Sequence, residues 1–265
     1  METVSLNQYL SKSNVWALRL LGFETFSKVR DISQVEKEYN LDKYARLVDL
    51  ELPTIEHYKK KEFEQGGTGE DDQIFFSLKE EIFSVKLSLA RKIYYQIIKE
   101  QVEKYGSEYF CELGCGYGFN LSYLDGMVYG GEYSENAVKI AEKMGMDVRN
   151  FNYYHREDYS FIRDGSTVFT VHSLEQIPDA RCFVEGIASQ REKVRYVVNI
   201  EPSFIDERTT LFGLLCNRYI EMNDYNRNLF SLLRERDDIE ILEYERDVVG
   251  LNPLNSANII VWRFR

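Results

Sequence analysis

A glycine-rich run, ELGCGYG at residues 112–118, overlaps the end of the strand-like run EYFCEL at 108–113. Three glycines alternate with other residues there. Glycine adopts positive φ readily and, having no Cβ, lets a ligand press against the main chain. In open α/β sheets, ligands bind at the carboxyl ends of the strands, where the strand order reverses. A tight turn without a ligand is the alternative, but three alternating glycines favour a binding loop that leads into a helix around Phe119.

Two nucleotide-binding loops do not fit the residues around these glycines. A phosphate-binding P-loop requires the pattern G-x-x-x-x-G-K-[ST], and no lysine follows the glycines here. The dinucleotide fingerprint G-x-G-x-x-G needs glycine at its sixth position, where this chain has Phe119. Glu112 would also face a pyrophosphate unfavourably. A carboxylate at that position instead suits a ligand with a cationic end.

Strand-like and helix-like runs alternate after residue 106. The strand-like runs lie at 108–113, 127–133, 166–172, 195–201, 239–248 and 258–264. Helix-compatible runs separate most of them, notably 134–145 and 179–192. This alternation predicts an α/β fold with a Rossmann-like, mainly parallel sheet and helices on both faces. The linker VGLNPLN before the last run contains no helix, so we expect a C-terminal antiparallel strand pair.

The first part of the chain has a helical pattern instead. Apolar residues recur at near-helical spacing in 33–51 and more clearly in 77–106. Ser77 and Glu80 form a capping-box pattern at the start of the second run, and Gly106 stands where a helix-ending glycine belongs. We therefore expect two helices here.

The chain is expected to consist of a helical N-terminal cap at 1–106 and a ligand-binding domain at 107–265. Within the cap, EQGGTGEDD at 64–72 reads as a flexible connection, with a mobile lid over an active site as the alternative. Within the second domain, 212–238 suits an amphipathic helix. That helix would either line a substrate pocket or simply pack against its neighbours.

At this point the chain resembles the class I S-adenosylmethionine-dependent methyltransferases, over about residues 107–265. ELGCGYG matches the family's first motif, written E/D-x-G-x-G-x-G, and YGGEYSENAVKIAEKMG at 129–145 is similar to its second strand and following helix. The resemblance implies S-adenosylmethionine as the cofactor. It implies cofactor contacts in these two segments from Glu112, Gly114, Cys115, Gly116, Tyr117, Gly118, Glu132 and Tyr133.

Glu132 has the most specific of these implied roles. It stands about 20 residues beyond the glycine loop, where the family places the acid that binds the ribose hydroxyls. Two hydroxyls that donate to one carboxylate form a favourable charge-assisted pair. Taken alone, Glu132 would be read as a surface acid.

The resemblance continues in STVFTVHSLEQIPD, which is similar to the family's fourth strand and the turn after it. It implies that Thr170, His172 and Ser173 lie near the methionine end of the cofactor or its methyl group. One departure concerns the adenine amino group, which the family often binds with an Asp after the third strand. Here Asn150 or Asn152 would have to accept that hydrogen bond.

Methyl transfer to a hydroxyl or an ammonium requires alignment of the acceptor and the loss of its proton, which a positioned base assists. Candidates should lie at the carboxyl ends of the fourth and fifth strands. His172 is the first candidate base, with a purely structural histidine as the alternative. Glu175 lies in the turn after it. Glu201 ends the fifth strand and could act as a base, bind a cationic substrate or cap the helix after EPS.

The charge and the cysteines narrow the class of protein further. The formal net charge is −11, whereas proteins that bind a phosphate backbone normally carry a basic face, so a nucleic acid substrate is disfavoured. We recognise no secretory signal, and no run approaches the roughly 18 apolar residues that span a bilayer, so a cytoplasmic protein is expected. Its four cysteines should then be reduced, and because they form no CxxC pair, no metal site is expected.

The sequence therefore predicts an S-adenosylmethionine-dependent methyltransferase that acts on a hydroxyl or amine of a small molecule or peptide by in-line transfer. An RNA methyltransferase acting on tRNA is one alternative. A catalytically silent partner subunit that binds the cofactor, or nothing, is the other. The sequence leaves the acceptor and the oligomeric state open, a homodimer included.

Overall fold

The computed structural model describes residues 1–11 and 14–265, and the strands in that part of the chain form one ten-stranded sheet. The strands are β1 (Glu2–Val4), β2 (Gln73–Leu78), β3 (Glu81–Lys86), β4 (Tyr109–Leu113), β5 (Met127–Glu132), β6 (Val148–Asn150), β7 (Ser166–Val171), β8 (Val194–Glu201), β9 (Ile239–Gly250) and β10 (Ala257–Phe264). Their order across the sheet is β1-β3-β2-β9-β10-β8-β7-β4-β5-β6.

The sheet has a parallel half and an antiparallel half. Strands β8, β7, β4, β5 and β6 run parallel, and the strand order reverses beside β4, because β5 lies on one side of it and β7 on the other. Strand β10 pairs antiparallel with both β8 and β9. The predicted α/β fold and the antiparallel C-terminal pair are confirmed. The reversal places the glycine loop at the kind of crevice where such sheets bind ligands.

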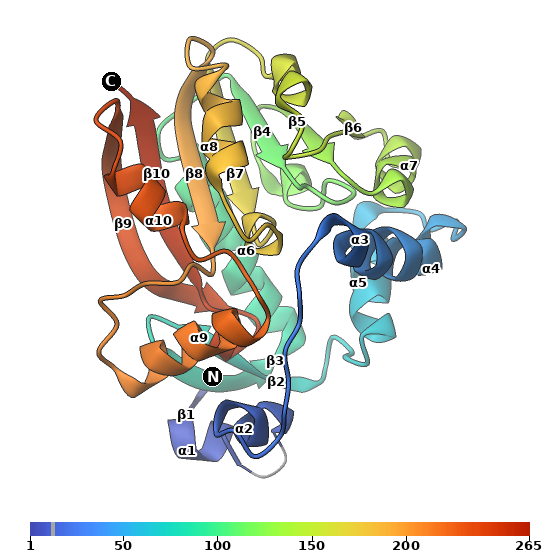
Figure 1. Cartoon of the computed structure of the whole chain (residues 1–265). Coiled ribbons are helices and arrows are strands. Elements are labelled where there is room, and N and C mark those ends of the chain that lie inside the picture. The colour runs from blue at the N-terminus through green and yellow to red at the C-terminus, as the bar shows by residue number, and fades with distance from the viewer. Residues whose placement is uncertain (12–13) are drawn as a thin grey trace.

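Helices cover both faces of the sheet (Figure 1). The α-helices are α1 (Leu6–Tyr9), α2 (Val15–Leu20), α3 (Ile32–Val35), α4 (Ala45–Val48), α5 (Ile55–Gln65), α6 (Leu87–Glu103), α7 (Glu135–Lys143), α8 (Arg181–Ala188), α9 (Leu211–Met222) and α10 (Leu229–Arg234). A π-helix, η1 (Glu36–Tyr44), joins α3 to α4, and short 3₁₀ turns lie at η2 (Leu121–Tyr123), η3 (Arg156–Phe161), η4 (Leu174–Gln176) and η5 (Pro253–Asn255). Figure 1 shows α8 and α10 in front of the sheet and α6 behind it.

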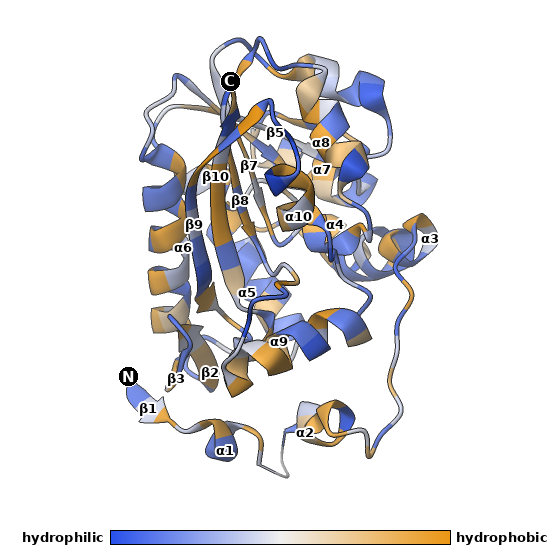
Figure 2. Cartoon of the chain, turned by 60° about the vertical axis from the view of Figure 1, so that its left-hand side comes forward, coloured by the Kyte–Doolittle hydropathy of each residue, from blue (hydrophilic) through white to orange (hydrophobic). Residues whose placement is uncertain are grey.

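Strand β10 shows how the two faces are filled. Ile259 and Val261 belong to the core shared with α6 and α7, whereas Ile260 and Trp262 belong to the core shared with α8 and α10. This alternation follows from the two-residue period of a strand. Both faces are covered, and accordingly all of β7 and the first six residues of β10 are buried. Figure 2 shows the apolar stretch of β10.

The prediction of one helix over 77–106 is wrong in its first third. Residues 73–86 form the β2–β3 hairpin, Ser77 is buried in β2 opposite Gly250 of β9, and α6 begins only at Leu87. Lys79 and Glu80 have φ values of +50° and +66° and make the hairpin turn. Ile82 and Val85 are both buried on β3, and their three-residue spacing also fits a helix. That shared spacing explains the error.

Two other helical predictions need refinement. The run 33–51 is helical, but its middle is the π-helix η1. The run 212–238 contains two helices, α9 and α10, because Asp224 has a φ of +52° and Asn226 Oδ1 accepts hydrogen bonds from the main chain at the start of α10. Several apolar residues of α9 belong to the same hydrophobic cluster as Tyr9 of α1. No residue of the run 212–238 lines the cavity described below.

Candidate active site

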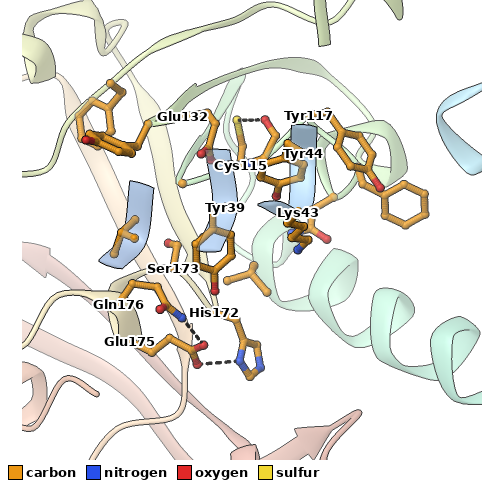
Figure 3. Close-up of a pocket in the computed structure, with 18 of the residues that line it drawn as sticks. Tyr39, Lys43, Tyr44, Cys115, Tyr117, Glu132, His172, Ser173, Glu175 and Gln176 are labelled. Atoms are coloured by element: carbon orange, nitrogen blue, oxygen red, sulfur yellow. Dashed lines mark hydrogen bonds and ion pairs between the residues drawn. The ribbon is translucent and has the colours of Figure 1, made fainter. Parts of the chain in front are cut away.

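A cavity of about 300 Å³ lies where β4, β5 and β7 end (Figure 3). One wall consists of the glycine loop after β4 and the turns after β5 and β7. The facing wall comes from the N-terminal part of the chain, namely η1, α5 and α6. The residues predicted for the site that line the cavity are Gly114, Cys115, Gly116, Tyr117, Glu132, Tyr133, Asn152, His172, Ser173 and Glu175.

The glycine loop needs its glycines for close contact with two other segments. Gly114 has a φ of +74°, and a Cβ there would overlap the side chain of Ser173 in the turn after β7. Gly116 has a φ of +56°, and a Cβ there would lie 2.7 Å from Tyr44 Oη at the end of η1. The main chain of the loop therefore touches both walls of the cavity. The helix expected after the loop is reduced to turns and the 3₁₀ segment η2.

Glu132 ends β5 and is bound to the loop. Its Oε2 accepts a hydrogen bond from Gly116 N at 2.8 Å, and its Oε1 accepts one from Ser134 N at 2.8 Å. Burial raises the pKa of this carboxyl group, against the opposing effect of the two N–H donors. A carboxylate offers about four lone-pair positions, so Glu132 keeps acceptor capacity for hydroxyl groups of a ligand.

Glu112 lies behind the loop rather than in the cavity lining. It is fully buried, and its Oε1 accepts a hydrogen bond from Asn120 Nδ2 at 2.6 Å. Its Oε2 has no hydrogen-bond partner in the part of the chain that the structure describes. Burial raises the pKa of Glu112 to about 8, although the Asn120 hydrogen bond lowers it. Because Asn120 lines the cavity, Glu112 acts on the site through that amide.

Of the two asparagines expected to bind the adenine amino group, only one lines the cavity. Asn152 lines the cavity, and its Oδ1 accepts a hydrogen bond from Tyr154 N at 3.0 Å. Asn150 is exposed on β6, outside the cavity lining. Gly118 also lies outside it, where a Cβ would face Met146. Asn152 is therefore the better placed of the two asparagines.

His172 and Glu175 form a hydrogen-bonded pair at the end of β7. His172 Nδ1 lies 3.0 Å from Glu175 Oε2, and Asn255 Nδ2 donates to the same oxygen at 3.2 Å. An ionised carboxylate can only accept hydrogen bonds, so this contact assigns the proton to Nδ1 and leaves Nε2 as an acceptor. Burial lowers the pKa of His172, but the charge and hydrogen bond of Glu175 outweigh it and raise the pKa overall. His172 can therefore gain and lose a proton beside the cavity.

The backbone of His172 is also unusual. Its φ of +49° is rare for a residue with a Cβ and costs on the order of 1 kcal/mol. Strain of this kind persists where the surroundings hold it. Here His172 N donates to Ile200 O of β8 at 3.1 Å, which fixes the turn that aims the ring.

Glu201, at the end of β8, lies outside the cavity lining. Its carboxylate accepts hydrogen bonds from the main-chain N–H groups of Ser173, Leu174 and Glu175, at 3.0 to 3.2 Å. Burial raises the pKa of Glu201 to about 7, with a further contribution from the charge of Glu175. Glu201 thus caps the turn that carries the His172–Glu175 pair.

The facing wall was not found from the sequence. Four tyrosines, Tyr39, Tyr44, Tyr94 and Tyr95, line the cavity from η1 and α6. Within the described residues, none of their hydroxyl groups has a protein hydrogen-bond partner, so they can bind a polar ligand. Lys43, Lys59 and Glu62 line the same wall. No motif marks these positions, and only the high tyrosine content, 19 residues, hinted at an aromatic pocket.

In residues 1–11 and 14–265, no three His, Cys, Asp or Glu side chains are grouped so that they could hold a metal ion. All four cysteines are free thiols. No helix of the described chain has the length and apolar character needed to cross a membrane.

Comparison with solved structures identifies the fold. Magnesium protoporphyrin IX methyltransferase (ChlM) from Synechocystis, with bound SAM, matches with a TM-score of 0.50 and 12% sequence identity, over 91% of this chain and 100% of that one. A SAM-dependent methyltransferase from Anabaena variabilis matches with a TM-score of 0.49 and 14% identity, over 91% and 99% of the two chains. OxaC in complex with SAH and oxaline gives 0.44 and 12%, over 63% of this chain.

The match to OxaC covers 46% of that protein, so this chain spans about half its length. No protein-family model matches the sequence. No curated protein matches it either. The match to ChlM shows that this chain has the fold of the class I S-adenosylmethionine-dependent methyltransferases, as the resemblance in the glycine loop implies.

Proposed function

We propose that this chain is an S-adenosylmethionine-dependent methyltransferase that modifies a hydroxyl or amine of a small molecule or peptide. The observation that carries this proposal is the content of one cavity. Gly116 and Glu132 lie on the same wall as His172 and Glu175, so a ligand-binding loop and a candidate base face the same space. The class I fold is consistent with that arrangement.

The residues present fit the proposed cofactor. Glu132 lines the cavity with unused acceptor capacity, which suits the two ribose hydroxyls. Asn152 can accept a hydrogen bond from the adenine amino group. The main chain of Gly114 and Gly116 would contact the rest of the cofactor, because these glycines have no side chain to keep a ligand away.

When bound beside Gly116 and Glu132, S-adenosylmethionine would supply an electrophilic methyl group on a sulfonium, with a neutral thioether as the leaving group. The chain's own task is to align the acceptor and take its proton. His172 Nε2 receives that proton, and the Glu175 carboxylate, 3.0 Å from Nδ1, stabilises the imidazolium. A positioned base of this kind contributes about 10²–10⁴-fold to the rate.

We further propose that residues 1–106 supply the cap that encloses the acceptor and that 107–265 bind the cofactor. Strands β1, β2 and β3 and helix α6 of the first part also belong to the sheet and its core, so η1 and α5 are the elements that cover the cavity. Tyr39 and Tyr94 of the N-terminal part face the cavity that His172 lines from the other side. The net charge of −11 favours a small molecule or peptide over a nucleic acid.

A labelled-methyl assay tests this function. Wild-type protein is incubated with [methyl-³H]-S-adenosylmethionine and separate pools of small molecules, peptides and RNA. We expect label in a small-molecule or peptide pool, and turnover about 100-fold lower in His172→Ala. His155→Ala, at an exposed histidine, should not change turnover. Label confined to RNA would contradict the acceptor class, and equal turnover in His172→Ala would contradict the assigned base.

A further inference from the structure

Two lysines share one carboxylate in the N-terminal wall of the cavity. Lys43 Nζ lies 2.9 Å from Glu62 Oε1, and Lys59 Nζ lies 3.1 Å from Glu62 Oε2. Tyr117 Oη of the glycine loop donates to Glu62 Oε2 at 2.7 Å. Within the described residues, neither lysine forms an ion pair with another acid. All three charged side chains line the cavity, so the cluster presents one positive charge in excess.

The excess charge falls mainly on Lys59. Burial lowers the pKa of Lys59, Glu62 raises it and the nearby Lys43 lowers it, with a lowered pKa as the result. Burial raises the pKa of Glu62, but the two lysines outweigh this effect and lower it, so Glu62 is already ionised and shared. The ammonium of Lys59 is therefore incompletely compensated. A partly buried cation in this situation gains from an added anion.

The other acids near the cavity do not supply that anion. Burial lowers the pKa of Lys43, but the charges of Glu62 and Glu132 raise it overall. Within the described residues, Lys43 and Glu132 form no ion pair, and the Glu132 carboxylate accepts from two main-chain N–H groups. Glu175 is paired with His172, and burial raises the pKa of Glu112 to about 8. Asp31 is exposed and caps α3. Glu56 and Glu70 pair with Arg91 of α6, and their side chains are 41% and 29% exposed, so water screens them. The cluster is thus left with an unmatched charge toward the cavity.

We propose that Lys43 and Lys59 bind a carboxylate group of a ligand in the cavity, beside the glycine loop. Figure 3 shows Lys43 beside Tyr44, and the Tyr44 ring packs edge-on against Tyr117 of the glycine loop. A single negative charge matches the excess of one, whereas a phosphate would exceed it. The carboxylate comes either from the amino-acid end of the cofactor, in which case the inference rests on the proposed function, or from the acceptor.

The first arm of the test is directed at the cofactor. S-adenosylhomocysteine carries the amino-acid carboxylate, and 5′-methylthioadenosine lacks it. We expect Lys43→Met and Lys59→Met, which keep most of the side-chain volume, to weaken binding of S-adenosylhomocysteine about 10-fold or more in calorimetric titrations. Binding of 5′-methylthioadenosine should stay within about twofold. Lys61→Met is the matched control, because Lys61 lies on the same helix α5 but outside the cavity, paired with Glu64.

The second arm is directed at the acceptor. Protein saturated with S-adenosylhomocysteine is titrated with benzoate and with benzamide, its neutral counterpart. If the acceptor supplies the carboxylate, benzoate alone binds, and each lysine variant abolishes that binding. Glu62→Gln removes the competing carboxylate and should tighten binding in whichever arm responds.

The inference is overturned if folded Lys43→Met and Lys59→Met proteins, checked by circular dichroism, match wild type in both arms. Wild-type protein that binds no S-adenosylhomocysteine would instead contradict the proposed function. Benzoate titrated without that ligand would then still decide the lysine site. Weaker benzoate binding in Lys43→Met and Lys59→Met would support the carboxylate site. Benzoate binding unchanged by both substitutions would contradict the carboxylate site.

Discussion

Gly116→Ala should destabilise the protein because the new methyl group meets Tyr44. The Cβ would lie 2.7 Å from Tyr44 Oη, whereas the next atom of that ring, Cζ, would lie 3.5 Å away. An alanine at a φ of +56° costs about 1 kcal/mol on its own. Displacement of a packed ring adds about 1–3 kcal/mol. We therefore expect a total loss of about 2–4 kcal/mol in the free energy of unfolding.

Tyr44→Phe separates the two contributions because it removes only the atom in conflict. Among the described residues, Tyr44 Oη has no hydrogen-bond partner, so Tyr44→Phe alone should change stability by less than about 0.5 kcal/mol. In the Tyr44→Phe background, Gly116→Ala should then cost only about 1 kcal/mol. The expected coupling energy between the two positions is about 1–3 kcal/mol.

Urea denaturation of the four proteins, followed by circular dichroism, measures this coupling. Gly106→Ala is a matched control, because Gly106 has a φ of +57° and a methyl group there would meet no atom of another segment within 4 Å. It should cost about 1 kcal/mol whether residue 44 is tyrosine or phenylalanine. Additivity of Gly116→Ala and Tyr44→Phe within about 0.3 kcal/mol would refute the docking of η1 on the glycine loop.

Three further predictions concern buried charges. Glu175→Gln should lower the pKa of His172 in an NMR titration. It should also cost more stability below pH 6.5 than at pH 8, because a raised histidine pKa stabilises the fold at low pH and this contribution is lost as pH rises through that pKa. An unchanged pKa of His172 would contradict its pairing with Glu175. Burial raises the pKa of Glu112 from an ordinary 4.5 to about 8, so its contribution to the free energy of unfolding should fall as pH rises from 5 to 8. In urea titrations, Glu112→Gln should flatten this decline by up to about 1 kcal/mol per pH unit. An equal pH dependence in wild type and variant would contradict the raised pKa. Asp247→Asn weakens a fully buried ion pair with Arg208 and should lower the free energy of unfolding by about 3–5 kcal/mol. A loss below about 1 kcal/mol would show that this ion pair contributes little to stability.

The cofactor side of the candidate site was largely predictable because it is local in sequence. The loop at 112–118 and Glu132 each follow a strand of the parallel half, and parallel strands bring their carboxyl ends to one edge of a sheet. His172 follows β7 in the same way. Strand-like runs and short spacings place these residues at one edge of the sheet, and the family resemblance supplied the cofactor contacts expected of Glu132 and His172.

The facing wall depends on contacts between distant segments, and these leave no pattern in the sequence. Lys43 and Lys59 meet only because η1 and α5 pack over the loop, and either residue read alone is an ordinary surface lysine. The β2–β3 hairpin was missed for a related reason. Its pairing with β9, between Leu78 and Val249, stabilises a strand in a segment whose apolar spacing also fits a helix.

Calorimetric titration with S-adenosylmethionine tests most directly whether the glycine loop and Glu132 bind this cofactor. We predict saturable binding to the wild-type protein and a loss of affinity of at least about 100-fold in Glu132→Ala, because two charge-assisted hydrogen bonds are removed. Glu135→Ala, at an exposed acid in the first turn of α7, should bind as wild type does. Absence of binding to the wild type, or equal affinity in Glu132→Ala, would contradict the account.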